Sequence, residues 1–240
     1  MKKIAMTMMA VALVAGAASA ADVSIGVDFA SAYVFRGVTL NDGFVAQPWG
    51  EVSGFPIDEK YGSIAFGIWG NYDIDDLEGQ DSDMSEVDYY VVYTLPVTNL
   101  DISVSYTEYT YEQGDSDKEV GLSIGTGLGD TGLYASLAAN YGVGGAVDES
   151  WYFVAGLDYE QSLSEALTLS AGVTVAYALV EDAEDGFNDA TAGLGLSYAL
   201  NENWSVGGSV TYIAQLDDDV LTDDAYDVDL LGMISIGCDF

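Results

Sequence analysis

Apolar and polar residues alternate along most of this chain after residue 20. In the segment 167–177, Leu169, Val173 and Tyr177 share one parity, while Ser170 and Thr174 share the other. A period of two indicates a β-strand with one apolar and one polar face. The same pattern recurs at 23–29, 44–53, 64–72, 87–93, 100–106, 120–124, 133–141, 151–159, 167–177, 192–198, 204–212 and 230–240. The sequence therefore predicts an all-β protein, with the phase of 44–53 left open because of Pro48.

The apolar parity of these segments suits lipid better than a protein core. It carries Val, Leu, Ile and Tyr with few charges, whereas the opposite parity carries Gly, Ser, Thr and Ala. A soluble sandwich would place the bulky residues inside and the charges outside. Backbone groups in hydrocarbon must all be paired, which excludes an open sheet edge. We therefore favour a transmembrane antiparallel β-barrel of about twelve strands, an even number as bacterial barrels have, over a secreted soluble β protein.

The connections between the predicted strands alternate in length and charge. They are mostly short after the even-numbered segments, and mostly longer and often acidic after the odd-numbered ones. Tyr and Trp residues fall near both ends of the segments, as in the aromatic belts at the two membrane interfaces. Short periplasmic turns and longer external loops are typical of outer-membrane barrels. Both termini are therefore expected in the periplasm, with the acidic loops outside the cell.

The first twenty residues indicate a cleaved Sec-type signal peptide. Lys2 and Lys3 precede an apolar stretch at 4–15, and Ala18-Ser19-Ala20 offers a small-residue cleavage site. The apolar stretch is shorter than the roughly 20 residues that a spanning helix needs, so a retained anchor helix is the less favoured alternative. We expect a signal peptide at 1–20 and an outer-membrane barrel at 21–240.

The charge balance and the absence of histidine exclude several classes of function. Beyond residue 20 the cations are Arg36, Lys60 and Lys118, against 40 acidic residues. Nucleic acid is excluded as a partner, because cations must neutralise its phosphates. The chain has no histidine, and Cys238 is its only cysteine, which removes the commonest general base and any intrachain disulfide. We expect neither an enzyme nor a cofactor.

The segment from Phe29 to Val38, FASAYVFRGV, resembles the first-strand motif of the TorF-type porin family of bacterial outer-membrane proteins. Gln47-Pro48, GIWGN at 67–71 and EVDYY at 86–90 extend the resemblance over about the first third of the mature chain. The family usually has Asp before the Tyr of the first motif. This chain has Ala32 there, so a role of that carboxylate is absent or moved. The resemblance implies passive transport of small solutes without catalytic residues.

The closing strand, which ends at Phe240, resembles the terminal signal of outer-membrane barrels. This resemblance implies the barrel assembly machinery as a partner, beside outer-membrane lipid. The sequence leaves the oligomeric state open, a homo-oligomer included.

Charged residues on the polar parity are the candidates for lining a pore. Arg36 has two interpretations: a constriction residue that orients or selects solutes, or a residue paired with carboxylates and loop carbonyls that fixes the first hairpin. Arginine's planar fork favours the pairing. The carboxylates form either a lining that attracts cations or solvated groups without a role in conduction. The candidates are Asp28, Arg36, Glu86, Asp88, Asp158, Asp227 and Asp229, the last two expected on the wall beside the first strand.

The acidic loop after the third predicted strand holds the metal candidates. These are Asp73, Asp75, Asp76, Asp81 and Asp83. Their spacing does not match a calcium-binding loop with Gly sixth and Glu twelfth. A solvated acidic loop is therefore favoured over weak calcium or magnesium binding, and no metal site is predicted.

These patterns predict a porin-like outer-membrane channel for ions and small solutes, with a preference for cations. Twelve strands lie between the narrow barrels of ~8 strands and the wide porins of 16–18. One alternative is a non-conducting structural or adhesive barrel whose acidic loops do the work. The other is a barrel hydrolase that uses carboxylates, against which the missing histidine counts.

Overall fold

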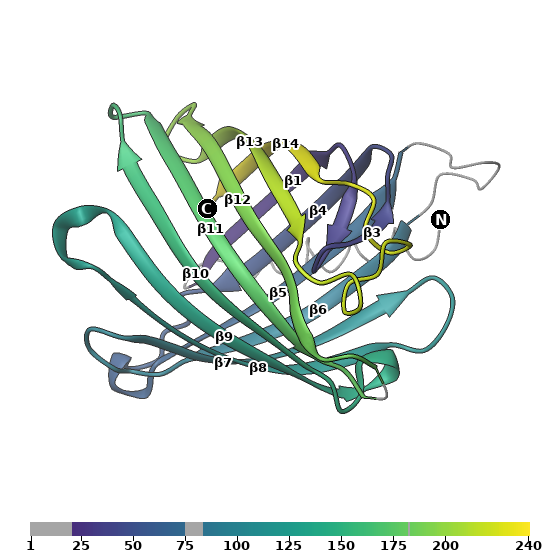
Figure 1. Ribbon diagram of the computed structural model, residues 1–240. Helices are drawn as coiled ribbons and strands as arrows, with labels where there is room; N and C mark the ends of the chain where they lie inside the picture. The colour runs from purple at the N-terminus through teal and green to yellow at the C-terminus, as the bar shows by residue number, and fades with distance from the viewer. Residues whose placement is uncertain (1–20, 75–83, 182) are drawn as a thin grey trace.

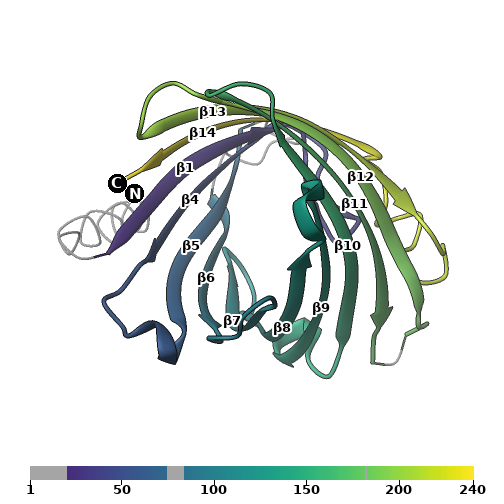
Figure 2. The same ribbon diagram turned by 90° about the vertical axis from the view of Figure 1, so that its left-hand side faces the viewer.

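The computed structural model describes residues 21–74, 84–181 and 183–240 (Figure 1). Twelve strands close into a barrel in the order β1-β14-β13-β12-β11-β10-β9-β8-β7-β6-β5-β4, and they surround a common axis (Figure 2). The strands are β1 (Asp22–Ala30), β4 (Val45–Ser53), β5 (Ser63–Asp73), β6 (Met84–Thr94), β7 (Asp101–Tyr111), β8 (Asp117–Gly127), β9 (Leu133–Gly144), β10 (Trp151–Ser162), β11 (Leu167–Leu179), β12 (Gly186–Ala199), β13 (Trp204–Gln215) and β14 (Leu230–Asp239). The predicted twelve-stranded antiparallel barrel is confirmed.

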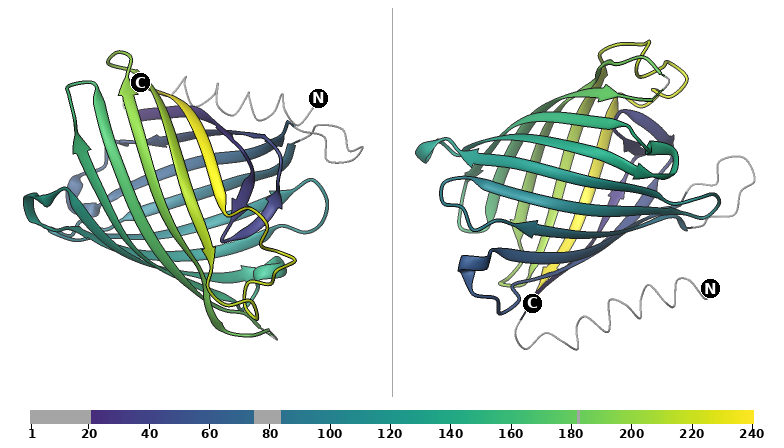
Figure 3. Two further views of the ribbon diagram at one scale, coloured as in Figure 1. Left: turned by 45° about the horizontal axis from the view of Figure 1, so that its top comes forward. Right: turned by 90° about the horizontal axis from the view of Figure 1, so that it is seen from below.

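The barrel closes where the first strand meets the last. β1 pairs antiparallel with β14 on one side and with β4 on the other. The amide of Phe240 donates a hydrogen bond of 2.9 Å to the carbonyl of Val23, so the C-terminus lies beside the start of β1 (Figure 3). The predicted signal peptide at 1–20 lies outside the described residues. Among those residues, no helix has the length and apolarity needed to cross a membrane.

The two faces of the barrel reverse the usual distribution of a soluble protein. Large apolar side chains of the strands are exposed, as at Leu137 (63%), Leu194 (59%) and Ile234 (62%). Polar pairs lie on the inner face, where the hydroxyls of Thr174 and Thr191 are 2.7 Å apart. Side chains directly opposite each other on paired strands share a face. The alternation read from the sequence is therefore the lipid-facing and lumen-facing alternation of a transmembrane barrel.

The structure settles the phase of β4. Trp49 is paired with Gly26, and its ring covers the position where a Cβ of Gly26 would lie. Trp49 thus faces the lumen, together with Gln47, whose side-chain amide donates a hydrogen bond to Asn71. Pro48 faces outward. The pairing between β4 and β5 passes over Gln47 and Pro48, because proline has no amide hydrogen for the ladder.

Several strands extend further than the apolar pattern indicated. The segments predicted at 100–106, 120–124 and 192–198 belong to β7, β8 and β12, which are longer at their external ends. The external ends of β8 and β12 carry inward-facing acidic residues, Glu119 and Asp189, so the apolar alternation stops before the strand does. In β12 a register shift opposite Val175 and Tyr177 adds a bulge. Strand ends beside the acidic loops were therefore the least predictable boundaries.

The long first connection contains a feature that the pattern did not indicate. Residues 31–44 hold a two-stranded hairpin of β2 (Tyr33–Phe35) and β3 (Val38–Asn41), which forms its own small sheet. Its turn is Arg36-Gly37, with φ of 53° and 79°. A two-residue hairpin turn with positive φ at both positions favours glycine at the second. The connection is therefore a folded element rather than a solvated loop (Figure 1).

Candidate functional site in the barrel lumen

The β2–β3 hairpin crosses the lumen near the external ends of the strands. At its base, Tyr33 packs with Ala30 and Val45 and lies 5.4 Å from the ring of Trp69. At its tip, Arg36 reaches Glu119 on β8. β8 lies on the opposite side of the ring from β1 and β4, so the hairpin is fixed to both sides of the barrel and narrows the lumen.

The tip of the hairpin is anchored by a bidentate ion pair. Arg36 donates from its two terminal nitrogens to the two carboxylate oxygens of Glu119, at 2.7 and 2.6 Å. Its guanidinium also lies over the rings of Phe35 and Tyr152, at 4.7 and 4.4 Å from their centroids. Burial acts to lower the pKa of Arg36, but the hydrogen bonds and charge of Glu119 outweigh it, and the pKa is raised. Arg36 is thus a fixed, partly buried cation.

The bulge in β12 holds the backbone of the same turn. Asn188 and Asp189 are both buried there. The amide of Asn188 donates to the carbonyl of Arg36 at 2.8 Å, and Tyr152 donates to Asp189 at 2.6 Å. A Cβ at Gly37 would displace a terminal methyl group of Leu221, which can move, so the turn needs glycine mainly for its positive φ.

Tyrosine hydroxyls bind the remaining carboxylates of the wall. Tyr33 donates to Glu86 at 2.8 Å, and Tyr111 donates to Asp117 at 2.8 Å. Burial raises the pKa of the Tyr33 hydroxyl far above its ordinary value, and the charge of Glu86 adds to the effect. We call the buried and partly buried groups around the hairpin the hairpin cluster; it comprises Tyr33, Arg36, Glu86, Asp88, Tyr109, Tyr111, Asp117, Glu119, Tyr152, Asn188 and Asp189.

Five of the members of the hairpin cluster are carboxylic acids and one is a base. Burial of an acidic group is costly unless the group is paired or hydrogen-bonded. Glu86, Asp117, Glu119 and Asp189 all accept hydrogen bonds. Asp88 differs, because its Oδ1 atom has no hydrogen-bond partner among the described residues. The cluster therefore holds more acidic groups than bases, and one buried carboxyl oxygen, Oδ1 of Asp88, has no hydrogen-bond partner among the described residues.

Further along β9 to β13, toward the ends of these strands that lie away from the hairpin, the wall of the lumen is lined by small residues. A cavity of about 400 Å³ lies along β9 to β13. We call this surface the small-residue wall; it comprises Ser170, Gly172, Gly193, Gly195, Ser209 and Thr211, with Asp158 beside them. Small side chains leave the interior of a twelve-stranded barrel open on this side, as a passage for water and solutes requires.

The structure places the predicted pore-lining residues in three environments. Glu86 and Asp88 belong to the hairpin cluster, Asp158 lines the small-residue wall, and Asp28 is half-buried on the lumen face of β1. Arg36 lies at the turn of the separate β2–β3 hairpin, outside the barrel wall, and it is paired with a carboxylate, that of Glu119.

The placement of Asp227 and Asp229 on a strand wall was wrong. Both residues are exposed and precede β14 in the connection at 216–229. This connection rests on the hairpin, since Thr39 accepts hydrogen bonds from the amides of Asp227 and Val228 at 3.2 and 3.0 Å. The roles of all these residues in conduction stay predictions.

Sequence reasoning missed Tyr33, Asp117, Glu119 and Asp189. Glu119 faces the lumen from β8, and a longer prediction for this strand would have included it. The side chain that selects it is Arg36, which is distant in sequence and meets it only after the barrel closes. Long-range contacts of this kind leave no local signal.

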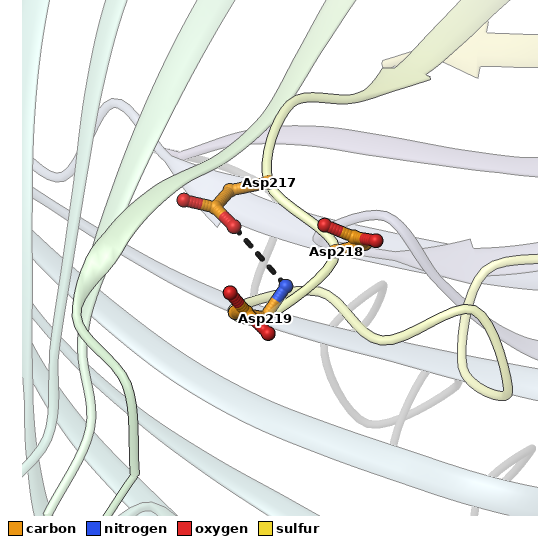
Figure 4. A group of neighbouring side chains, drawn as sticks. All are labelled: Asp217, Asp218 and Asp219. Carbon is orange, nitrogen blue, oxygen red and sulfur yellow. Dashed lines mark hydrogen bonds between the residues drawn. The ribbon is translucent and has the colours of Figure 1, made fainter.

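The metal candidates divide between described and undescribed residues. Asp73 accepts hydrogen bonds from Asn41 and Asn71, at 2.7 and 2.8 Å, whereas Asp75, Asp76, Asp81 and Asp83 lie outside the described residues. A different acidic group, Asp217 to Asp219, brings its carboxylates together in the connection after β13 (Figure 4). All three are exposed, and the amide of Asp219 donates to Asp217 at 3.1 Å. This is the geometry of a solvated acidic turn.

Known structures share the fold at low sequence identity. The COG4313 outer membrane channel from Pseudomonas putida F1 has a TM-score of 0.55 and 8% identity, over 92% of this chain and 94% of that chain. The KdgM porin in complex with disordered oligogalacturonate has a TM-score of 0.51 and 10% identity, over 91% and 98%. The Salmonella typhi outer membrane phospholipase dimer with bound calcium has a TM-score of 0.52 and 11% identity, over 90% and 90%.

At these identities the likeness shows the fold of a bacterial outer-membrane barrel, and the fold hosts both channels and an enzyme. No protein-family model and no curated protein matches the sequence.

Proposed function

We propose that this barrel lies in the outer membrane and forms a porin-like channel for ions and small solutes, with a preference for cations. The observation that carries the proposal is the cavity of about 400 Å³ along the small-residue wall, inside a closed barrel with an apolar outer face. The COG4313 channel and the KdgM porin support it through their shared fold. On this proposal, the hairpin is a constriction that narrows the route of solutes near the external side.

Charge supports the cation preference. Among the described residues, Asp28, Asp158 and the acidic members of the hairpin cluster face the lumen. Arg36 is the one cation of the described strands and hairpin that faces it. That cation is neutralised by Glu119. A lining with an excess of negative charge attracts cations and repels anions at low ionic strength.

A non-conducting barrel is the second candidate function. The firm anchoring of the hairpin at base and tip favours it, because a hairpin that never moves could close the lumen. A hydrolase has less support: the phospholipase shares the fold, but this chain has no histidine to serve as a general base.

Planar-bilayer recording on the purified barrel tests the proposal. A gel comparison of boiled and unboiled samples first establishes that the barrel is folded. Discrete conductance steps are expected, with a reversal potential in a salt gradient that reports cation selectivity. Folded protein that inserts into lipid and gives no conductance would overturn the channel and favour the structural barrel. A reversal potential that reports anion selectivity would agree with a channel but contradict the cation preference.

The partners form a separate part of the proposal. The exposed Phe240 at the end of β14 supports recognition by the barrel assembly machinery, and the apolar outer face supports contact with outer-membrane lipid. The TorF-type resemblance and a homo-oligomer stay predictions. Crosslinking of the barrel in native membranes measures the oligomeric state directly.

A further inference from the structure

A second cavity lies between the hairpin and the barrel wall. It has a volume of about 250 Å³, and its walls include the rings of Tyr33, Phe35 and Trp69, the amide of Gln47 and the carboxyl group of Asp88. Aliphatic side chains such as Leu231 complete it. The cavity is thus apolar and aromatic over most of its surface, with one acidic group.

The acidic group of this cavity lacks a counter-charge. Asp88 is 8% exposed, and its Oδ1 atom is without a hydrogen-bond partner in the described part of the chain. The neighbouring Glu86 acts on Asp88 through its charge and through a side-chain hydrogen bond, and Oδ1 is the atom of Asp88 that stays unpaired. A buried carboxyl oxygen without a hydrogen-bond partner is unfavourable, so a positive charge bound beside Oδ1 of Asp88 would be stabilised.

The described cations of the chain are all engaged elsewhere. Arg36 is held by both oxygens of Glu119. Lys60 binds Asp58 in an exposed turn, and Lys118 lies opposite Glu108 on the outward parity of β8. No cation of the described chain reaches Asp88, so a cation that pairs with its Oδ1 atom would have to come from solution.

The hairpin tip shows how this lumen already accommodates an organic cation. The guanidinium of Arg36 lies between aromatic rings and against a carboxylate. Aromatic faces attract cations most strongly where water is excluded. The cavity at Asp88 offers the same two elements, with Tyr33, Phe35 and Trp69 as the rings, and no side chain of the described chain supplies the cation.

We propose that this cavity is a binding site for a small organic monocation of the protonated alkylamine type. The ammonium group lies against Asp88, and the alkyl body lies among the aromatic rings. A calcium ion requires six to eight oxygen ligands, whereas the side-chain oxygens of the cavity come from Asp88, Gln47 and Tyr33, and the Tyr33 hydroxyl is bonded to Glu86. The inference names a solute class for the channel and rests on the proposed function for its meaning in transport; the binding itself does not need conduction.

Isothermal titration calorimetry on the full barrel in detergent tests the site. Propylammonium chloride is the probe, with sodium chloride and the neutral isostere 1-propanol as reference titrants. Saturable binding is expected for propylammonium alone. Asp88→Asn removes the charge and keeps the shape, and should weaken binding at least tenfold. Asp101→Asn is the matched control at the far end of the lumen, where Asp101 accepts from Tyr134 at 2.9 Å, and should bind as the parent does.

Trp69→Leu is the second variant, because it removes a ring and leaves the charge. It should also weaken propylammonium binding, and the mobility of unboiled samples shows that each variant is folded. Equal binding of propylammonium and sodium, or full affinity in folded Asp88→Asn, would overturn the site. Calcium binding at Asp88 without propylammonium binding would overturn the organic cation. Binding without bilayer conductance would support the binding site and contradict the channel function. Conductance without Asp88-dependent binding would support the channel function and contradict the binding site.

Discussion

The hairpin cluster and the small-residue wall face the same lumen and obey the same alternation, yet one is filled and the other is open. In the hairpin cluster, Glu86 and Glu119 are about 5% exposed and hold the hairpin through long side chains. Along the small-residue wall, Gly172 and Gly193 border a cavity of about 400 Å³. The parity of a residue decides whether it faces the lumen, and its size decides whether the lumen remains open there.

The contrast also separates two uses of a carboxylate. In the hairpin cluster, Glu119 is buried and fixes Arg36 at 2.6 Å. On the small-residue wall, Asp158 is exposed to the lumen and free to act on passing ions. A buried ion pair is strongly destabilised when one partner is removed, whereas an exposed charge acts mainly through a field that salt screens.

Removal of the hairpin should have the largest effect on the difference in openness between the two regions. We propose to replace residues 33–41 with a short Gly-Ser linker, which leaves all twelve barrel strands intact. The external half of the lumen should then become as open as the small-residue wall, and single-channel conductance should rise several-fold. Planar-bilayer recording measures the change.

Replacement of the connection at 112–116 with a linker is the matched control, since it lies between β7 and β8 outside the hairpin. It should leave the conductance close to that of the parent barrel. An unchanged conductance after removal of the hairpin, with the barrel folded, would contradict its role as the constriction.

Loss of the ion pair at the hairpin tip should have the next largest effect. In Glu119→Gln, the partly buried Arg36 loses its carboxylate; loss of one partner of a fully buried pair costs about 3–5 kcal/mol, and the loss here should lie toward the lower end of that range. Chemical unfolding of the barrel in lipid vesicles measures this free energy. The conductance of the variant should also fluctuate more, because the tip is no longer held.

The double variant Arg36→Met with Glu119→Gln provides the control. Removal of both charges should restore part of the stability, so the two single changes should be non-additive. Additive losses in the double-mutant cycle would show that Arg36 and Glu119 act independently, against the bidentate contact.

Much of the barrel could be predicted from the sequence, because adjacent residues of a strand in a barrel wall face lipid and lumen in turn and differ in polarity accordingly. Leu169 and Ser170 report lipid and lumen without knowledge of any other strand. The twelve strands and their antiparallel order follow from this local signal and from short turns. Strand ends such as 117–119 were missed, since their inward acidic residues break the apolar pattern.

The hairpin cluster could be predicted only in part. Glu86 and Asp88 were identified from parity, but the partner of Arg36 depends on closure of the ring and on the path of residues 31–44. The FRGV segment at 35–38 resembles a strand end as easily as a hairpin turn. The positive φ values of Arg36 and Gly37 depend on tertiary contacts, which the alternation of apolar and polar residues does not predict.

The smallest effect is expected at Asp158, and it sharpens the comparison on the open side. Asp158→Asn removes one exposed charge from the lumen and keeps the shape of the side chain. Cation selectivity, measured as the reversal potential in a salt gradient, should fall slightly. The fall should be visible near 0.01 M salt, where the screening length is about 30 Å, and should vanish near 1 M, where it is about 3 Å.

The salt dependence separates a field effect from a change in pore shape, because altered packing would persist at both ionic strengths. Glu165→Gln, in the exposed turn between β10 and β11, is the control that removes an equal charge outside the strands, and it should shift the reversal potential less. If Asp158→Asn leaves selectivity unchanged at low salt, ions do not pass along the small-residue wall. Selectivity must then arise at the hairpin cluster, where the acidic groups are buried and salt screens them least.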